Sequence, residues 1–449
     1  MQFARNPRLA CLPVSAALRP LRLPGFASLG GAYFVNELGN WLGEIALAVL
    51  VYEATGSPLA TAALFFGIHF TPALVGPPIV ARLESLPARR TLPALYAAEA
   101  LAFGALALLA GNFSLIAVIA LATFDGSIAS AARALTRASA TAVLAPAGQL
   151  REGNALLNVA FTIGAAGGPA IGGLVVAGAG IEAALIADAV SFLAVAVLLG
   201  ATRRLPSPEV EESEGAWRER LRLGLAYVNR RPALRRLLAA QAAAFIFFAL
   251  VIPIEVVFAK DTLDAGDAGY GALLASWGSG MVLGSLLFAG LGRVPLPALL
   301  VGSTLAIGIA YLGTAVAPSL IVACAASVLG GLGNGIQWIA LVTAVQELTR
   351  ATYQARVLSL LEALASATPG IGFLLGGVIA SIFEPRLAYA VAGAGVVIVL
   401  VIAGTRLRGA EWSPELDQGA DEGDPAQVTS AAASSLANTG KSGPALTGS

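Results

Sequence analysis

The chain has 449 residues, of which 57% are hydrophobic and only 12% are charged, and its mean hydropathy is +0.80. A soluble domain has about 25% charged residues, so this composition excludes a soluble protein and indicates one that crosses the membrane many times. Acidic and basic residues are equally numerous, with 27 of each. The zero net charge excludes the basic surface expected of a nucleic-acid-binding protein.

Apolar runs of about 20 residues, each long enough to cross a bilayer as one helix, occur twelve times. The first six lie near residues 26–50, 59–81, 92–111, 115–135, 155–177 and 181–200. The second six lie near residues 236–258, 270–291, 296–316, 319–342, 357–382 and 386–404. The polar segment 202–235 separates the two sets. The sequence therefore predicts an all-α, polytopic membrane protein with twelve transmembrane helices in two six-helix halves, 26–201 and 236–408.

Basic residues are concentrated in the segments that lie on one side of such an arrangement. If the N-terminus is cytoplasmic, all of the 27 Lys and Arg residues except Lys260 and Arg386 fall on the cytoplasmic side. The positive-inside rule therefore predicts that both termini and the segment 202–235 are cytoplasmic, with residues 1–25 forming a basic tail. We expect the protein to lie in the cell membrane as a multi-pass monomer.

The fifth span carries a glycine-rich motif, Gly164-Ala-Ala-Gly-Gly-Pro-Ala-Ile-Gly-Gly173. Gly164, Gly168 and Gly172 recur every four residues, so they share one helix face that a second helix can approach closely. Pro169 removes a backbone donor, which a membrane helix tolerates where neighbouring groups satisfy the freed carbonyl. Taken alone, the motif also fits a face used only for packing. A similar Pro369-Gly-Ile-Gly372 in the eleventh span indicates that the two halves are internal repeats.

The two polar segments after the first half have different characters. Trp217, Leu221, Leu225 and Val228 fall on one helical face among arginines, which predicts a short interfacial helix within 202–235. The segment 409–449 is acidic and then rich in Ser, Ala, Gly and Thr, which predicts a disordered cytoplasmic tail.

The fifth-span motif resembles the antiporter signature of the major facilitator superfamily, with matches at Gly164, Gly168, Pro169, Gly172 and Gly173. Other segments are similar to the enterobactin-exporter-like, drug–proton antiporter branch of that superfamily: Gly39-Asn-Trp41, Thr55-Gly-Ser-Pro-Leu-Ala60, Gln149-Leu-Arg-Glu-Gly-Asn-Ala155 and Leu223-Gly-Leu-Ala-Tyr-Val-Asn-Arg-Arg-Pro232. The resemblance covers residues 24–408. It implies a proton-coupled exporter of small molecules that works by alternating access.

The loop between the second and third spans is degenerate relative to the G-x-x-x-D-R-x-G-R-R motif of that superfamily. Glu84 stands where the acid belongs and Arg89-Arg90 match the basic pair, but the loop glycine is replaced. In the superfamily the acid pairs near the fourth span, so the resemblance implies a contact of Glu84 with Arg133 or Arg137. The fourth-span arginine motif with a following Gln-Gly is absent.

In this fold the first, fourth, seventh and tenth spans line the central cavity, and polar side chains fall on single faces of these spans. The predicted substrate- and proton-binding residues are Glu37, Asn40, Trp41, Glu44, Asp125, Gln241, Glu255, Asn334, Gln337 and Trp338. In the first span Tyr33 shares their face, and in the seventh span Phe245 and Phe248 do so.

The ionisable groups predicted at mid-membrane are acidic, and no Lys or Arg is expected at that depth. Such a group costs about 2.5–3.5 kcal/mol at the bilayer centre, and a low dielectric favours the neutral form of a carboxyl. Glu37 and Asp125 therefore fit proton or cation binding, with structural hydrogen bonding as the alternative. For Glu44 and Glu255, snorkelling to the outer surface is an equal alternative. Interhelical hydrogen bonding is the preferred interpretation of the remaining groups, Glu99, Asp188, Glu362 and His69.

The leading prediction is a proton-coupled exporter of small amphipathic or cationic molecules. Uptake by a facilitator or symporter is the transporter alternative, and a non-transporting receptor or scaffold would usually add a large extramembrane domain. An enzyme is not expected, because one histidine and two distant cysteines, Cys11 and Cys324, supply neither a metal cluster nor a nucleophile–base set. No ATP-binding glycine-rich loop is present, and neither a cofactor nor a metal is expected.

Overall fold

The computed structural model describes residues 18–83, 86–202, 205, 216–291, 294–350 and 353–407. Over these residues the chain is helical and contains no strand. It forms twelve segments that are long and apolar enough to cross a membrane, some of them made of more than one helix. The predicted all-helical, twelve-span architecture is confirmed.

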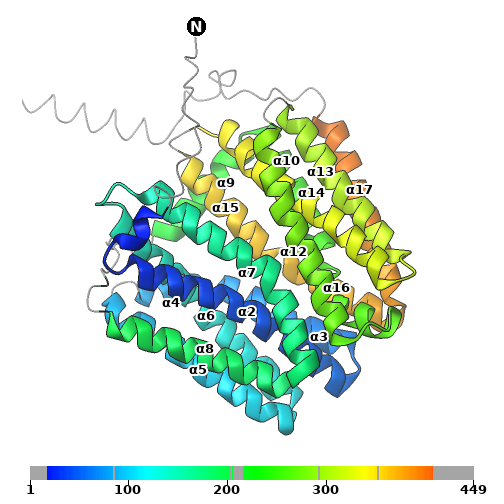
Figure 1. Ribbon diagram of the computed structural model, residues 1–449. Coiled ribbons are helices and arrows are strands. Elements are labelled where there is room, and N and C mark those ends of the chain that lie inside the picture. The colour runs from blue at the N-terminus through cyan, green and yellow to red at the C-terminus, as the bar shows by residue number, and fades with distance from the viewer. Residues whose placement is uncertain are drawn as a thin grey trace, which may run out of the picture.

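The first half follows the short helix η1 (Arg19–Arg22). Its six spans are α2 (Phe26–Thr55), the composite α3 (Pro58–Phe65), η2 (Phe66–Phe70) and α4 (Thr71–Leu83), then α5 (Ala88–Gly111), α6 (Leu115–Leu144), α7 (Leu150–Ala179) and α8 (Ile181–Ala201). In Figure 1 these helices, coloured blue to green, pack together on one side of the molecule.

Helix α9 (Ala216–Asn229), the predicted interfacial helix, precedes the second half. The remaining spans are α10 (Pro232–Ala249) with η3 (Ile252–Ile254), α11 (Glu255–Val257) and η4 (Phe258–Thr262), α12 (Gly266–Gly290), α13 (Leu296–Ala315), α14 (Leu320–Glu347), α15 (Gln354–Ala367) with α16 (Pro369–Ile382), and α17 (Pro385–Leu407). These helices lie on the other side of the molecule in Figure 1.

The turn between α2 and α3 shows how local sequence ends one span and begins the next. Gly56 adopts the left-handed conformation, with φ of 59°, and its N–H donates to the carbonyl of Tyr52. Ser57 then caps α3 by accepting a hydrogen bond from the backbone N–H of Ala60 at 3.2 Å. Pro58 follows at the first helical position, where its missing N–H costs nothing.

The two halves meet through α7 and α12, through α2 and α11, and through α3 and α16. In Figure 1, α3 lies beside α16. Where α2 ends, Lys260 Nζ lies 2.5 Å from Glu53 Oε1 of α2 and 2.7 Å from Asp267 Oδ1 of α12. Tyr52 donates a hydrogen bond to Asp261 at the same place. Ion pairing therefore joins the halves at the end of the bundle opposite α9.

Within the second half, α12 and α14 pack backbone against backbone. A Cβ at Gly331 would lie 2.8 Å from the carbonyl carbon of Trp277, and one at Gly284 would lie 2.9 Å from that of Leu332. Real Cβ atoms do not approach backbone so closely, so glycine is required on both helices. Small residues at such interfaces are the usual means by which helices associate in lipid.

Gly331→Ala should therefore force α14 away from α12 and reduce the free energy of unfolding by about 1–3 kcal/mol, the range for overpacked interiors. Gly302→Ala on α13 is the matched control, because no atom lies within 4 Å of a Cβ built there. The measurement is thermal unfolding of the purified variants in detergent. Equal unfolding temperatures for the two variants would contradict the packing described.

Candidate functional site

The polar face of α2 pairs with two arginines of α6. Glu37 is 1% exposed, and its Oε1 lies 3.8 Å from Nη1 of Arg133. One turn away on each helix, Arg137 Nε donates to the Tyr33 hydroxyl at 3.1 Å, and its guanidinium lies 5.0 Å from the centre of the Tyr33 ring. Glu37, one of the predicted substrate- and proton-binding residues, thus lies at a charged contact between α2 and α6.

The expectation that no Lys or Arg lies at the depth of Glu37 was wrong, because Arg133 approaches its carboxyl to 3.8 Å. The apolar run of the fourth span weakens at Arg133, so the sequence places the end of the span near residue 135, whereas α6 continues to Leu144. Arg133 and Arg137 lie inside that helix and face α2. Their expected partner, Glu84, lies outside the described residues. The basic pair of the same loop motif, Arg89 and Arg90, is exposed in the first turn of α5.

Asp125 belongs to a second acidic group within the first half. It is 7% exposed, and its charge interacts with those of Glu99 from α5 and Asp188 from α8, which are 0% and 1% exposed. Asn36 Nδ2 of α2 donates to Glu99 Oε2 at 3.4 Å. One oxygen of each carboxyl, namely Asp125 Oδ1, Glu99 Oε1 and Asp188 Oδ2, has no hydrogen-bond partner among the described residues.

Glycines of α2 make room for the Asp188 carboxyl. A Cβ at Gly43 would lie 2.5 Å from Asp188 Oδ2, and one at Gly39 would lie 3.4 Å from Asp188 Cγ. Ser191, on the same helix as Asp188, donates to its Oδ1 at 3.3 Å. The sequence analysis favoured hydrogen bonds between helices for Glu99 and Asp188. Glu99 makes one with Asn36 of α2, whereas Asp188 accepts its side-chain hydrogen bond from Ser191 of the same helix.

The glycine motif of α7 packs against α2, and its glycines contact α2 at successive helical turns. A Cβ at Gly164 would lie 3.1 Å from Glu37 Cβ, one at Gly168 would lie 2.6 Å from Trp41 Cβ, and one at Gly172 would lie 3.2 Å from Leu42 Cα.

Beyond these three glycines, Gly173 faces the second half. A Cβ built there would lie 2.8 Å from Gly271 Cα of α12, and one built on Gly271 would lie 2.7 Å from the carbonyl oxygen of Pro169. The motif therefore holds α7 against α2 and against the other half.

Glu44 of α2 and Glu255 of α11 lie on helices that pack together where the halves meet. Glu44 Oε1 lies 3.4 Å from His69 Nε2, which is carried by η2. The sequence predicted that Glu255 shares a helix face with Gln241, and this prediction was wrong. The helix that carries Gln241 ends at Ala249, and Pro253 interrupts the span before Glu255.

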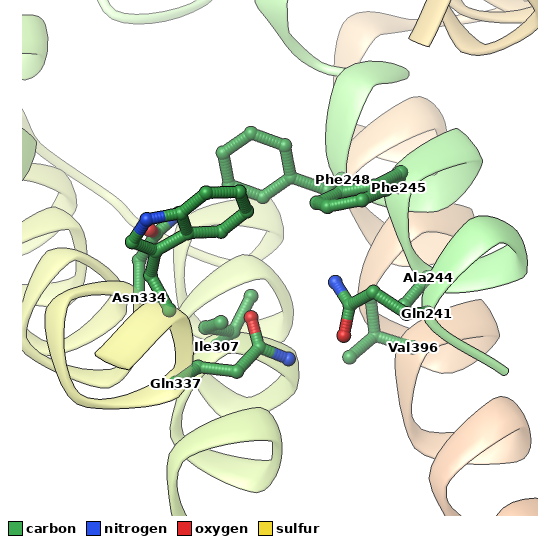
Figure 2. A pocket seen from close by; sticks show the side chains of 9 residues that line it. Gln241, Ala244, Phe245, Phe248, Ile307, Asn334, Gln337 and Val396 are labelled. Atoms are coloured by element: carbon green, nitrogen blue, oxygen red, sulfur yellow. The ribbon is translucent and has the colours of Figure 1, made fainter. Parts of the chain in front are cut away.

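A small pocket in the second half brings together Gln241 of the seventh span and the three predicted residues of the tenth span. Gln241 of α10 and Asn334, Gln337 and Trp338 of α14 line it. Figure 2 shows the side chains of Gln241 and Gln337 on opposite sides of this pocket. Gln337 Nε2 donates to Thr304 Oγ1 of α13 at 2.8 Å, which fixes its amide.

Aromatic and aliphatic side chains complete the pocket lining. Phe245 and Phe248 do so as predicted neighbours of Gln241, and the Phe245 and Trp338 ring centres are 6.5 Å apart. Ile307 and Val396 also line the pocket, and the sequence analysis missed both. Nothing in the sequence marks them, because each is an apolar residue in an apolar span.

Of the predicted α2 residues, Asn40 has a buried Nδ2 without a hydrogen-bond partner among the described residues, and Trp41 packs on Gly168. Within the described part of the chain, no group of three or more His, Cys, Asp or Glu residues is placed to hold a metal ion. The chemistry available at the site is therefore that of buried carboxyls, arginines, one imidazole and neutral amides.

Solved structures of transporters share this fold. The nucleoside transporter NupG has 15% identity and a TM-score of 0.67, with 85% of this chain and 99% of that chain covered. A bacterial homologue of the iron transporter ferroportin in an inward-facing state has 16% identity and a TM-score of 0.67, covering 85% and 98%. A bacterial homologue of the human lysosomal transporter Spinster, inward-facing and occupied, has 14% identity and a TM-score of 0.67, covering 87% and 98%.

These identities support likeness of fold alone, and no curated protein matches the chain in sequence. The sequence profile of the family described as transmembrane secretion effector matches residues 15–430, which include all twelve spans. With a major facilitator fold and a profile match of this extent, the chain belongs to the transmembrane secretion effector family of major facilitator transporters.

Proposed function

We propose that this transporter is a proton-coupled exporter of small amphipathic molecules, including cations, and that it works by alternating access in the cell membrane. The observation that carries the proposal is the contact between the buried carboxyl of Glu37 on α2 and the partly exposed guanidinium of Arg133 on α6, 3.8 Å apart. A family described as a secretion effector supports the outward direction. Similarity to the enterobactin-exporter-like branch supports it further.

Protonation of Glu37 would change the net charge of the Glu37–Arg133 contact by one unit. As an ion pair the two side chains are neutral overall, which a membrane interior tolerates. A proton on Glu37 would leave Arg133 without a counter-charge, and Arg133 also acts electrostatically on Glu99. Proton binding at Glu37 would therefore change the electrostatic surroundings of the second acidic group, which contains Glu99, Asp125 and Asp188.

The substrate class follows from the different linings of the two halves. The pocket in the second half offers amides and aromatic rings and no charged side chain among its lining residues. The first half offers the carboxyls. An amphipathic molecule with an apolar ring system and a cationic or hydrogen-bonding group would match both surfaces, because aromatic side chains also attract cations.

Uptake is the second candidate, because the fold shared with nucleoside and peptide transporters sets no direction of transport. The test is a substrate screen in proteoliposomes with an imposed pH gradient. Substrate accumulation in the direction opposite to proton flow supports a proton-coupled exporter. Substrate accumulation in the same direction as proton flow supports a symporter.

The proposed orientation predicts which end of the bundle is reachable from outside the cell. With Cys11 and Cys324 replaced by serine, Glu182→Cys at the start of α8 should react with a membrane-impermeant maleimide in intact cells. Arg230→Cys, after α9, should react only when the membrane is permeabilised. Both native positions are exposed, so the reverse pattern of labelling would contradict the orientation.

The proton-coupling proposal predicts that amide substitution separates driven transport from exchange. Glu37→Gln or Asp125→Asn should reduce pH-gradient-driven export by about tenfold or more, the loss expected when a proton-transfer step is blocked. Exchange of substrate down its gradient should stay comparatively intact, since it needs the cavity but no net proton movement. Both rates are measured in the same proteoliposome preparation.

The matched control for these variants is Glu362→Gln, because Glu362 is exposed on α15. It should leave both rates near wild type. If the carboxyls only hydrogen-bond neighbouring helices, the amides should preserve both rates. If they bind a cationic substrate directly, both rates should fall together. Unchanged driven export in the double variant Glu37→Gln, Asp125→Asn would remove the assignment.

A further inference from the structure

The pocket of the second half extends from α10 and α14 to two further helices, α13 and α17. Gln241 and Gln337 line it from α10 and α14, and Ile307 of α13 and Val396 of α17 line it with side chains that are only 3% and 2% exposed. This part of the pocket is therefore shielded from its surroundings. A polar group of a ligand that enters it must find its hydrogen-bond partner among the pocket side chains, because burying such a group unpaired is costly.

Close packing of α13 on α14 fixes one wall of the pocket. A Cβ at Gly333 of α14 would lie 2.6 Å from the carbonyl oxygen of Ser303 and 3.1 Å from Ile307 Cγ1. Glycine at this position therefore lets the two helices touch. Gln337 follows Gly333 by one helical turn on the same face of α14, and Thr304 follows Ser303 on α13. The close approach of the helices thus brings the Gln337 side chain within reach of Thr304.

The Gln337 amide is oriented by a residue that does not itself line the pocket. Thr304 is 8% exposed, and its Oγ1 accepts a hydrogen bond from Gln337 Nε2 at 2.8 Å. The nitrogen and oxygen of an amide lie on opposite sides of its carbon, so holding the nitrogen at Thr304 also sets the direction of the oxygen. In the part of the chain that the structure describes, no donor reaches Gln337 Oε1. The oxygen is therefore available to a ligand as an acceptor.

Gln241 supplies a second amide that lacks a partner. It is 7% exposed, and its side chain makes no hydrogen bond with the residues that the structure describes. Figure 2 shows the Gln241 and Gln337 amides facing each other, with the rings of Phe245 and Phe248 above them. A buried amide without a partner is unusual in a folded protein, so this arrangement points to a ligand that would complete it.

The aromatic side of the pocket is held in place from behind. The Phe248 ring centre lies 5.6 Å from that of Trp277 and 6.3 Å from that of Tyr311. Tyr311 also donates a hydrogen bond to the backbone carbonyl of Phe248 at 3.2 Å. A fixed aromatic surface beside fixed amides suits a flat ring, because offset and edge-to-face contacts between rings are favourable.

We propose that this pocket binds the amine-bearing edge of a flat aromatic substrate, and that Thr304 is a positioning residue that makes the pocket select hydrogen-bond donors. The N–H groups of an aromatic amine donate well, whereas its nitrogen accepts poorly because the lone pair is delocalised into the ring. Such an amine matches the acceptor oxygen that Thr304 fixes on Gln337. This inference rests on the proposed function and narrows its substrate class from amphipathic molecules to aromatic amines.

The test compares two dyes that differ only in their donors. Rhodamine 123 carries amino groups on a flat, cationic ring system, and tetramethylrhodamine methyl ester is the same cation with those amino groups fully methylated. Equilibrium binding of each dye to the full-length protein in lipid nanodiscs is measured by fluorescence anisotropy, with binding to protein-free nanodiscs subtracted. The variants are Thr304→Val, which keeps the size of the side chain but loses the acceptor, and Thr304→Ser, which keeps the hydroxyl.

Wild type should bind rhodamine 123 about tenfold more tightly than the methylated dye, the ratio expected when a ligand leaves a buried acceptor unpaired. Thr304→Val should lower this ratio to about threefold or less, because the freed amide can turn its nitrogen towards the ligand. Thr304→Ser should restore the ratio. Thr314→Val is the matched control and should keep the wild-type ratio, since Thr314 is buried on the same helix but donates to the Ala310 carbonyl at 3.0 Å.

Equal affinities of wild type for the two dyes would overturn the proposal, and so would a failure of wild type to bind rhodamine 123. A wild-type ratio retained in Thr304→Val would also overturn it, because the preference would then follow the bulk of the methyl groups. If Thr304→Val fails to fold, Gln337→Leu should abolish the ratio and is judged by the same outcomes.

The binding measurement uses no pH gradient, so it is independent of proton coupling. The expected dye ratios in a protein that shows no pH-driven export would refute the proposed function and leave the pocket assignment standing. Driven export without the expected ratios would refute this inference alone.

Discussion

An ionisable group inside a bilayer needs a partner or must give up its charge, and α2 is the helix on which this constraint acts most strongly. Glu37 meets Arg133 of α6, Asn36 meets Glu99 of α5, and Glu44 meets His69 of η2. The glycines of α7 and of α2 itself allow these contacts, because they let neighbouring backbones and the Asp188 carboxyl approach closely. Movement of α2 relative to its neighbours would therefore change the surroundings of several carboxyls at once.

The two halves divide the chemistry unequally. In the described chain, the buried carboxyls Glu37, Glu99, Asp125 and Asp188 belong to the first half, whereas the pocket of the second half is lined by amides and aromatic rings. The acidic residues of the second half that lie where the halves meet are Glu255, Asp261 and Asp267. This division separates groups that can exchange protons from groups suited to an uncharged ring system. Because the carboxyls are distributed unequally, proton binding would change the electrostatic energy of one half more than that of the other.

The sequence predicts the twelve spans and the polar faces of α2 and α14, since both follow from hydropathy and from the helical period. It does not predict that the fourth span continues past Arg137 to Leu144, because charged residues lower the hydropathy that defines the end of a span. Glu255 was placed on the wrong face because Pro253 breaks the helical period that its assignment assumed. The grouping of Asp125 with Glu99 and Asp188 depends on how α5, α6 and α8 pack, and no spacing within one helix can show it.

The central claim is that substrate movement and proton movement are linked in opposite directions. The most direct test records both fluxes at once in proteoliposomes that hold a transported substrate and a trapped pH-sensitive dye, with no pH gradient at the start. The account predicts that substrate leaving down its own gradient acidifies the vesicle interior, and that a protonophore removes the acidification without stopping substrate efflux. Substrate efflux at the same rate with no change in internal pH would contradict it.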